Sequence, residues 1–308
     1  MKARSHYCLM TAAHNEESSI GATIESVVKQ TKKPLLWVIV SDGSTDRTVE
    51  LVGAAAKKHD FIVLLRREKS ASESGRADGI SAGKVPALRM AEAYIREHAS
   101  CPYDFLGNLD ADIVIGENWF EELLKEFEAD PELGLGGGQL INILPDGTRA
   151  PGGLLNPEAV GGAVQMFRLQ CWKDIGAYKP YGHEDCLANA QSRRAGWKVR
   201  SFPRLMGEHH VPCMGYAPQM KYKLPVLFRM GRMAYIMRTP LWAECIVCVA
   251  RMVSRPYAVG GTWRLAGYVN AFLQREVKIP VKTSWLLAQR GWVGIFTQKI
   301  RRVLAGLK

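Results

Sequence analysis

Two carboxylates one residue apart are the side chains of this sequence best suited to chemistry. Asp110 and Asp112 flank Ala111 and directly follow an apolar run, residues 103–109, that predicts a buried strand. Carboxylates at a strand end can bind a hard cation such as Mg²⁺ or Mn²⁺, and Mg²⁺ is commonly shared with substrate phosphates. The pair predicts a site for a divalent cation and a nucleoside diphosphate. Because acidic pairs also occur on solvated loops, this interpretation depends on other motifs.

The first hundred residues repeat one pattern of strand, polar loop and helix. Apolar runs predict strands at residues 7–13, 35–40 and 61–65. Apolar residues at helical spacing follow each strand, and they are Ile20, Ile24 and Val27, then Val49, Val52 and Ala56, then Leu88, Ala91 and Ile95. Alternating strands and helices with apolar strands predict an α/β fold with a parallel sheet covered on both faces.

Acidic loops follow three of the predicted strands. Asn15 and Glu16 follow the first, Asp42 follows the second, and the Asp110–Asp112 loop follows a later one. In open α/β sheets ligands bind beyond the carboxyl ends of the strands, so these loops are expected on one rim. None of the turns carries the glycine pattern of a dinucleotide-binding or P-loop protein, which removes the main support for those classes. A rim lined by carboxylates needs a cation to hold phosphate.

The second half of the chain supplies a further acidic pair and two histidines. A strand interrupted by three glycines is predicted at residues 133–143, followed by a turn-rich stretch at 146–157. Glu184 and Asp185 open a predicted helix, where negative charge is favourable. His209 and His210 follow a strand-like segment at 198–202.

These motifs together resemble the inverting nucleotide-sugar glycosyltransferases of family 2, which have the GT-A fold. The matching stretches are Thr11 to Glu16, Val40 to Asp46, Gly83-Lys84 with Ala87-Leu88, Asp110-Ala111-Asp112 and Glu184-Asp185. One departure is Ser41, where the family often has a second Asp. The C-terminal region more loosely resembles bacterial exopolysaccharide transferases. The resemblance implies a Rossmann-like, mostly parallel sheet flanked by helices, followed by a basic helical C-terminal region.

The resemblance also implies a role for each matched residue. Asp185 would be the catalytic base with Glu184 beside it. Asp112 would hold a divalent cation, Mn²⁺ or Mg²⁺, helped by His209 or His210. The nucleotide-sugar, a UDP- or GDP-sugar, would contact Ala13, Asn15, Glu16, Asp42, Lys84, Asp110 and Ala111. Ordinary alternatives exist: turn chemistry for Asp42, a solvated amine for Lys84, helix-dipole complementation for the acidic pair, and packing for the histidines.

Positive charge is concentrated at the C-terminal end. The chain has a net charge of +11, and residues 201–308 hold 17 Lys and Arg against 3 Glu, so the first 200 residues carry −3. Segments 224–237, 241–252 and 285–304 mix apolar residues with cations, which predicts helices at an anionic membrane surface. The alternative is amphipathic helices packed on the catalytic domain. We expect no spanning helix and, without a recognisable motif, no nucleic-acid partner.

We therefore expect a glycosyltransferase domain at residues 1–215, with a nucleotide-sugar half at 1–112 and an acceptor half at 113–215. A basic region at 216–308 would associate with the membrane. The seven scattered cysteines indicate reduced thiols, and no signal peptide is apparent, so we expect a cytoplasmic protein on the inner face of the cytoplasmic membrane. The acceptor would be a saccharide or lipid-linked precursor of a polysaccharide. A nucleotidyltransferase and a non-catalytic binding module remain alternatives.

Overall fold

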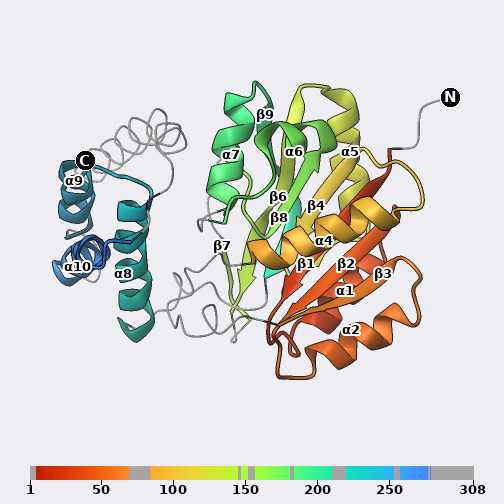
Figure 1. The fold of residues 1–308 in the computed structure, drawn as a ribbon, viewed down its shortest axis with the longest axis horizontal. Coiled ribbons are helices and arrows are strands. Elements are labelled where there is room, and N and C mark those ends of the chain that lie inside the picture. The colour runs from red at the N-terminus through yellow and green to blue at the C-terminus, as the bar shows by residue number, and fades with distance from the viewer. Residues whose placement is uncertain are drawn as a thin grey trace. The chain divides into compact units, whose positions relative to one another are not determined.

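The structure is a computed structural model that describes residues 5–68, 84–144, 147–151, 157–180, 184–209, 220–252, 257–276 and 278. The chain divides into two compact units, Met1–Cys213 and Met214–Lys308 (Figure 1). Each unit is described by itself.

A single sheet forms the centre of the first unit. Its strand order is β3-β2-β1-β4-β8-β6-β9-β5, with β7 paired to β6. The strands are β1 (Tyr7–Ala13), β2 (Leu36–Asp42), β3 (Ile62–Arg67), β4 (Phe105–Leu109), β5 (Ile113–Ile115), β6 (Leu133–Ile143), β7 (Arg149–Pro151), β8 (Val164–Arg168) and β9 (Lys198–His209). The first four strands along this order are parallel, whereas β8 runs antiparallel to both β4 and β6. The carboxyl ends of β1, β2 and β4 therefore meet at one rim.

Helices cover both faces of this sheet (Figure 1). They are α1 (Ile20–Val28), α2 (Thr48–Ala56), α4 (Val85–His98), α5 (Trp119–Ala129), α6 (Leu169–Ile175) and α7 (Glu184–Arg194). Because side chains alternate along a strand, Trp37 and Ile39 of β2 join the core cluster of α1, α2 and α5, while Val38 and Val40 join that of α4, α6 and α7. Two apolar layers therefore sandwich the sheet.

The predicted α/β class and the predicted elements around the rim are confirmed. The first three strands and helices form as the apolar spacing predicts, and Pro86 lies in the first turn of α4, where its missing N–H costs little. The glycines do not interrupt β6. A Cβ at Gly137 would lie 2.3 Å from the carbonyl oxygen of Val164, and one at Gly138 would lie 2.1 Å from that of Leu205. Here glycine allows close backbone contact.

The described part of the second unit contains three helices, α8 (Met220–Ile236), α9 (Leu241–Met252) and α10 (Val259–Leu273). The predicted helices at 224–237 and 241–252 are confirmed, α10 was not predicted, and segment 285–304 lies outside the described residues. Glycines bring these helices into backbone contact. An added Cβ would lie 1.7 Å from the carbonyl oxygen of Arg264 at Gly231, and 1.9 Å from that of Phe228 at Gly267. None of the helices in the described ranges is long and apolar enough to cross a membrane.

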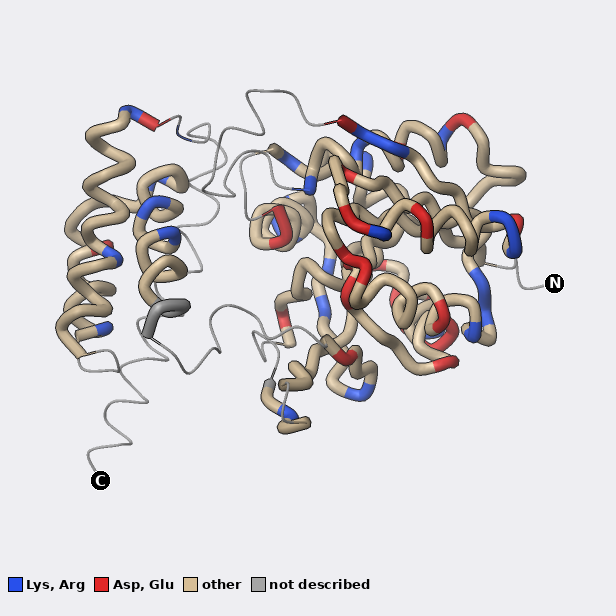
Figure 2. Tube along the Cα trace, turned by 90° about the horizontal axis from the view of Figure 1, so that it is seen from below, with Lys and Arg blue, Asp and Glu red and all other residues tan. Residues whose placement is uncertain are grey.

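The second unit exposes most of the large apolar side chains at the surface of the described chain. Twelve large hydrophobic residues are exposed, and eleven of them follow residue 220; they include Trp242, Val249, Trp263 and Phe272. Basic positions recur along the same helices (Figure 2). Glu244, in contrast, is fully buried and accepts two hydrogen bonds from the Arg264 guanidinium, at 2.5 and 3.0 Å.

Candidate functional site

The loop between the two carboxylates is held by its backbone. Thr23 of α1 donates its hydroxyl to the carbonyl oxygen of Ala111 at 2.9 Å, and the Asp110 backbone N–H donates to the carbonyl oxygen of Ala163 at 2.8 Å. The Ala111 side chain is buried in the core. With the backbone between the carboxylates fixed, the Asp110 and Asp112 side chains remain partly accessible, at 28 and 23 % of their side-chain surface.

Lys84 connects the donor motif to the acidic pair of α7. Its ammonium donates to Asp110 Oδ1 and, at 3.2 Å, to the Gly162 carbonyl oxygen, and lies 3.9 Å from Glu184 Oε1. Burial alone would lower the pKa of Lys84, but the charges of Asp110, Glu184 and Asp185 outweigh it, so the pKa is raised. Lys84 is therefore a charged group shared by residues 74 positions apart in the sequence.

Glu16 lies within the field of the same carboxylates. Its side chain accepts a hydrogen bond from the Ser19 hydroxyl at 2.6 Å, and its backbone N–H donates to Thr48 Oγ1 at 2.7 Å. Partial burial raises the pKa of Glu16, and the charges of Asp112 and Asp110 raise it further against the effect of Ser19. The first acidic loop and the Asp110–Asp112 loop thus come together at one rim, as expected.

Asp112 and His209 form a closely spaced pair. β5, which begins directly after Asp112, pairs with β9, so Ile113 lies opposite His209. This register places His209 Nε2 2.8 Å from Asp112 Oδ2. Burial would lower the pKa of His209, but the hydrogen bond and the charge of Asp112 raise it overall. His210 lies outside the described residues.

The pair fits part of a divalent-cation site. Adjacent ligands in an octahedral site with bonds of about 2.1 Å lie about 3 Å apart, close to the separation of Asp112 Oδ2 and His209 Nε2. Carboxylate and imidazole are both ligands of such ions. In the described ranges no group of three or more His, Cys, Asp and Glu side chains could hold a metal ion. Any further ligands would come from His210, which lies outside the described residues, or from phosphates and water.

The second acidic loop makes mainly internal contacts. Asp42, at the end of β2, is buried and paired with Arg67 at the end of β3. Asn15, at a left-handed φ of 57°, accepts the Thr45 backbone N–H at 2.8 Å, which joins the first two loops. Asp46 accepts the backbone N–H of Thr48 at 3.0 Å, the turn role that its position favours. Ala13 is the buried last residue of β1.

The acidic pair opens α7 as expected. Glu184 and Asp185 lie in its first turn. Gly162 packs against Asp185, since a Cβ at Gly162 would lie 2.9 Å from the Asp185 Cβ. Buried Asn189 donates to the carbonyl oxygens of Asp185 and Val160, at 2.7 and 2.8 Å. The start of α7 is therefore fixed against the loop that Lys84 also contacts.

Several residues at the site were not predicted from the sequence. They are Thr23, Arg67, Asn108 and Asn142. Asn108 donates to Asp110 Oδ1 at 3.1 Å and to the Gly162 carbonyl oxygen at 2.6 Å. Asn142 accepts from His209 Nδ1 at 3.0 Å if that nitrogen carries the proton. A polar residue inside an otherwise apolar strand is the signal that marks Asn108; Asn142 shares its strand with Gln139 and stands out less.

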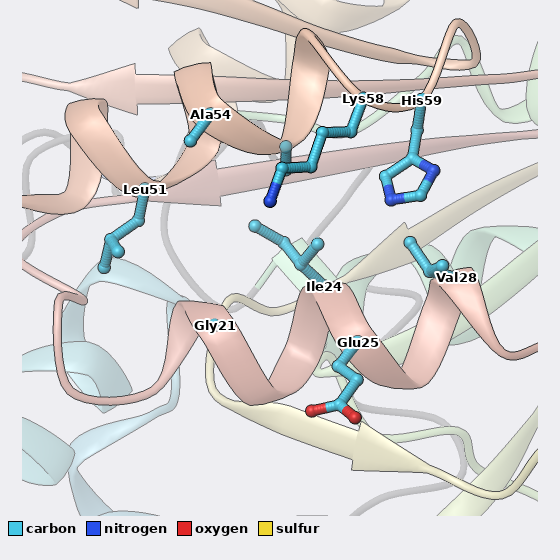
Figure 3. Close-up of a pocket in the computed structure, with 9 residues that line it drawn as sticks. Gly21, Ile24, Glu25, Val28, Leu51, Ala54, Lys58 and His59 are labelled. Carbon is cyan, nitrogen blue, oxygen red and sulfur yellow. The ribbon is translucent and has the colours of Figure 1, made fainter.

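A pocket between α1 and α2 lies apart from these residues (Figure 3). Its lining is largely apolar and includes Gly21, Ile24, Val28, Leu51 and His59. Glu25 points away from it and pairs with Lys29. Because no carboxylate of the rim lines this pocket, we do not assign the nucleotide to it.

Sequence comparisons match part of the chain to a known family. Residues 8–155 match the sequence model of glycosyl transferase family 2. Two curated relatives are poly-beta-1,6-N-acetyl-D-glucosamine synthases. The Staphylococcus aureus protein is 28% identical over 127 residues, 41% of this chain and 26% of the relative. The Staphylococcus epidermidis protein is 27% identical over 213 residues, which cover 63% of this chain and 45% of the relative. The chain thus spans less than half the length of these relatives.

Solved structures share the fold. The mannosyltransferase PcManGT from Pyrobaculum calidifontis, in complex with GDP-Man and Mn²⁺, has a TM-score of 0.59 at 15% identity, with 89% of each chain covered. GalNAc-T7 with UDP, GalNAc and Mn²⁺ has a TM-score of 0.54 at 16% identity, covering 95% of this chain and 57% of that one. The architecture of the chain is therefore that of the GT-A glycosyltransferases.

Proposed function

Because this chain carries a family 2 glycosyltransferase domain of GT-A fold, we propose that it transfers a sugar from a nucleotide-diphosphate sugar to an acceptor hydroxyl with inversion. One observation carries the proposal. Lys84 contacts Asp110 of the donor motif and lies 3.9 Å from Glu184 of the acceptor motif. The elements to which we assign donor binding and the base thus share the ammonium of Lys84, which supports a direct transfer between them.

The donor would bind along the rim of β1, β2 and β4. Glu16 and Asp42 would accept hydrogen bonds from the nucleobase and Asp110 from a ribose hydroxyl. The ion pair with Arg67 supports a fixed position for the Asp42 carboxylate. Lys84, held among carboxylates, offers a positive charge close to the diphosphate. Ala13, Asn15 and Ala111 would shape this surface through their backbone.

Asp112 and His209 would hold a divalent cation, Mn²⁺ or Mg²⁺. The closeness of Asp112 Oδ2 and His209 Nε2 supports this assignment. A bound cation supplies charge that stabilises the leaving diphosphate. His210, beyond the described residues, stays a further candidate ligand.

Asp185 would act as the general base. Its carboxylate takes the acceptor hydroxyl proton while the hydroxyl oxygen bonds to the anomeric carbon. The anomeric carbon–oxygen bond to the diphosphate breaks on the opposite face, and its electron pair leaves with the diphosphate. Contact with Gly162 and the Asn189 hydrogen bond support a fixed position for Asp185. Glu184 would bind the acceptor beside it.

The acceptor would be a saccharide or lipid-linked polysaccharide precursor at the inner face of the cytoplasmic membrane. Residues 201–308 carry 17 cations against 3 anions, and eleven of the twelve exposed large apolar residues of the described chain lie in the second unit. An apolar surface with cations suits the interface of an anionic bilayer. We propose residues 216–308 as the membrane-associating region, and residues 1–112 and 113–215 as the donor and acceptor halves.

A donor screen tests this function. The protein is incubated with UDP- and GDP-sugars, Mn²⁺ and saccharide or lipid-linked acceptors, and released nucleoside diphosphate and the anomeric configuration of the product are measured. Asp112→Ala should abolish turnover and remove the Mn²⁺-dependent part of nucleoside diphosphate affinity. Asp185→Asn should slow transfer by at least about 10²-fold with donor affinity nearly unchanged.

Other outcomes of the screen would favour the alternatives. Diphosphate formed from a nucleoside triphosphate would identify a nucleotidyltransferase. If a nucleotide-sugar raised the thermal stability and none of the acceptors gave turnover, the protein would be identified as a binding module. Collapse of donor affinity in Asp185→Asn would move Asp185 into the donor site and overturn the mechanism.

A further inference from the structure

The register of three neighbouring strands aligns three polar side chains at the proposed cation site. β9 lies between β5 and β6, and His209 of β9 pairs with Ile113 of β5 on one side and with Asn142 of β6 on the other. Asp112, adjacent to Ile113, contacts His209 Nε2 at 2.8 Å. Asn142 Oδ1 lies 3.0 Å from the other ring nitrogen, Nδ1. His209 is thus held from both sides.

Asn142 is an unusual residue for its position. It is fully buried, and its Nδ2 has no hydrogen-bond partner within the described structure. An orphaned buried donor costs about 1–3 kcal/mol, more than an ordinary hydrogen bond returns. An apolar residue would suit the strand better as a matter of packing. The side chain therefore needs a reason beyond stability.

The contact with His209 supplies that reason. An amide oxygen can only accept, so it selects the imidazole tautomer with the proton on Nδ1. Without a cation, Nε2 donates its own proton to Asp112 at 2.8 Å; a bound cation would replace that proton and take the Nε2 lone pair, while Nδ1–H stays bonded to Asn142. Ligating histidines commonly donate their other ring N–H to such a partner, which orients the ring and increases its basicity.

We propose that Asn142 is a positioning residue that sets the tautomer and orientation of His209 for divalent-cation binding. This inference rests on the proposed assignment of Asp112 and His209 as ligands. Asn142 itself touches neither cation nor substrate. Its loss should weaken metal binding about 10- to 100-fold, the usual effect of removing such a partner.

Binding of Mn²⁺ to the full chain, followed by the electron paramagnetic resonance signal of free Mn²⁺ without turnover, tests the proposal. Asn142→Leu keeps the volume and removes both the acceptor and the orphaned donor. We expect it to bind Mn²⁺ about 10- to 100-fold more weakly while its thermal stability stays close to that of the wild type. Asn142→Asp keeps an acceptor and should keep the affinity within a few-fold.

Two controls separate positioning from folding. Gln165 is also a buried amide; among the described residues it is bonded to the Tyr178 hydroxyl and the Val160 carbonyl oxygen and not to Asp112 or His209. Gln165→Leu should lower stability and leave Mn²⁺ affinity unchanged. Long-range ¹H–¹⁵N spectra of the Mg²⁺-loaded protein should show the Nδ1–H tautomer of His209 in the wild type and a tautomer mixture in Asn142→Leu.

The outcomes are distinguishable. If wild type and Asp112→Ala bind Mn²⁺ equally poorly, with or without UDP or GDP, the proposed cation site itself fails. A second outcome is that the wild type binds Mn²⁺ and Asp112→Ala does not. If folded Asn142→Leu and folded Asn142→Asp then both bind Mn²⁺ with wild-type affinity, the role of Asn142 is overturned. Should Asn142→Leu fail to fold, Asn142→Ser provides the same comparison with the Asp variant.

Discussion

The two units of this chain differ in which side chains they bury and which they expose. In the first, apolar residues fill two layers around the sheet, and one large hydrophobic residue, Met90, is exposed within the described ranges. In the second, eleven large apolar residues are exposed, whereas the carboxylate of Glu244 is buried against Arg264. An exposed apolar surface beside a buried ion pair is the pattern expected of a region that meets a surface less polar than water, as we propose for residues 216–308.

The two units also differ in the contacts that join their helices and strands. Interlocking aromatic and aliphatic side chains join helices to sheet in the first unit. In the second, Gly231, Gly261 and Gly267 bring helix backbones together. Small residues at helix contacts and polar pairs inside are also how helices associate in membranes, where burying apolar side chains gives little advantage. Four substitutions test this contrast.

The buried ion pair gives the largest expected effect. Glu244→Leu leaves the Arg264 guanidinium unpaired and should lower the stability of α9 and α10 by about 3–5 kcal/mol, measured by amide hydrogen exchange of these helices. The double variant Glu244→Leu with Arg264→Leu should recover most of the loss. Lys125→Leu, which breaks two surface ion pairs in the first unit, with Glu121 and Glu122, should cost at most about 1 kcal/mol. Equal losses of stability in Glu244→Leu and Lys125→Leu would contradict the difference between the two units.

A glycine in the catalytic unit gives the next effect. Gly162→Ala places a Cβ 2.9 Å from that of Asp185 and must displace the proposed base. A shift of about 1 Å can cost on the order of 10²-fold in rate, so kcat should fall strongly while donor affinity stays the same. Gly161→Ala is the matched control, because nothing lies within 4 Å of its added Cβ. Equal rates for the two variants would contradict the fixed position of Asp185.

The exposed apolar surface predicts a smaller effect on membrane binding. Trp242 is 69% exposed. Trp242→Gln should lower binding to phosphatidylglycerol-containing vesicles about 10-fold, measured by co-sedimentation, because less apolar area enters the interface. Met90→Gln, in the first unit, should change nothing. If raising the salt concentration did not weaken vesicle binding by the wild type, the electrostatic part of the proposal would be removed.

The smallest expected effect concerns Glu16. Its raised pKa means that the folded protein favours the protonated carboxyl. The contribution of Glu16 to the free energy of unfolding is therefore fully present below the ordinary carboxyl pKa, and it is lost as pH rises through the higher pKa of the folded state. Glu16→Gln should therefore be more stable than wild type at pH 7 and equal to it in acid, measured by thermal melts across pH. Glu25, whose pKa the Lys29 hydrogen bond lowers, should show the opposite sign. A melting difference for Glu16→Gln that did not depend on pH would contradict the burial argument.

The sequence predicted the local elements better than their partners. Apolar spacing identified β1, α1, β2, α2, β3 and α4, because helix and strand periods are local properties. α5 was not predicted, although Phe120, Leu123 and Phe127 recur at helical spacing. α10 was also missed, because Gly260, Gly261 and Gly267 are poor helix formers that obscure the period.

The site was predicted as a set of loops and not as a set of contacts. Rim geometry anticipates that Glu16 and Asp112 approach each other. It cannot anticipate that the Lys84 ammonium bonds Asp110, or that Asn142 faces His209, because both depend on the register of strands far apart in sequence. The antiparallel entry of β8 between β4 and β6 was hidden for the same reason.

The glycine contacts of the second unit have a calorimetric consequence. The heat capacity of unfolding rises with the apolar surface newly exposed to water. With Trp242, Trp263 and Phe272 already at the surface, and helices joined partly through backbone, α8, α9 and α10 have less apolar surface left to expose. Their melting in water should therefore have a small heat-capacity step for its size, and the stability of this unit should vary less steeply with temperature than that of the sheet.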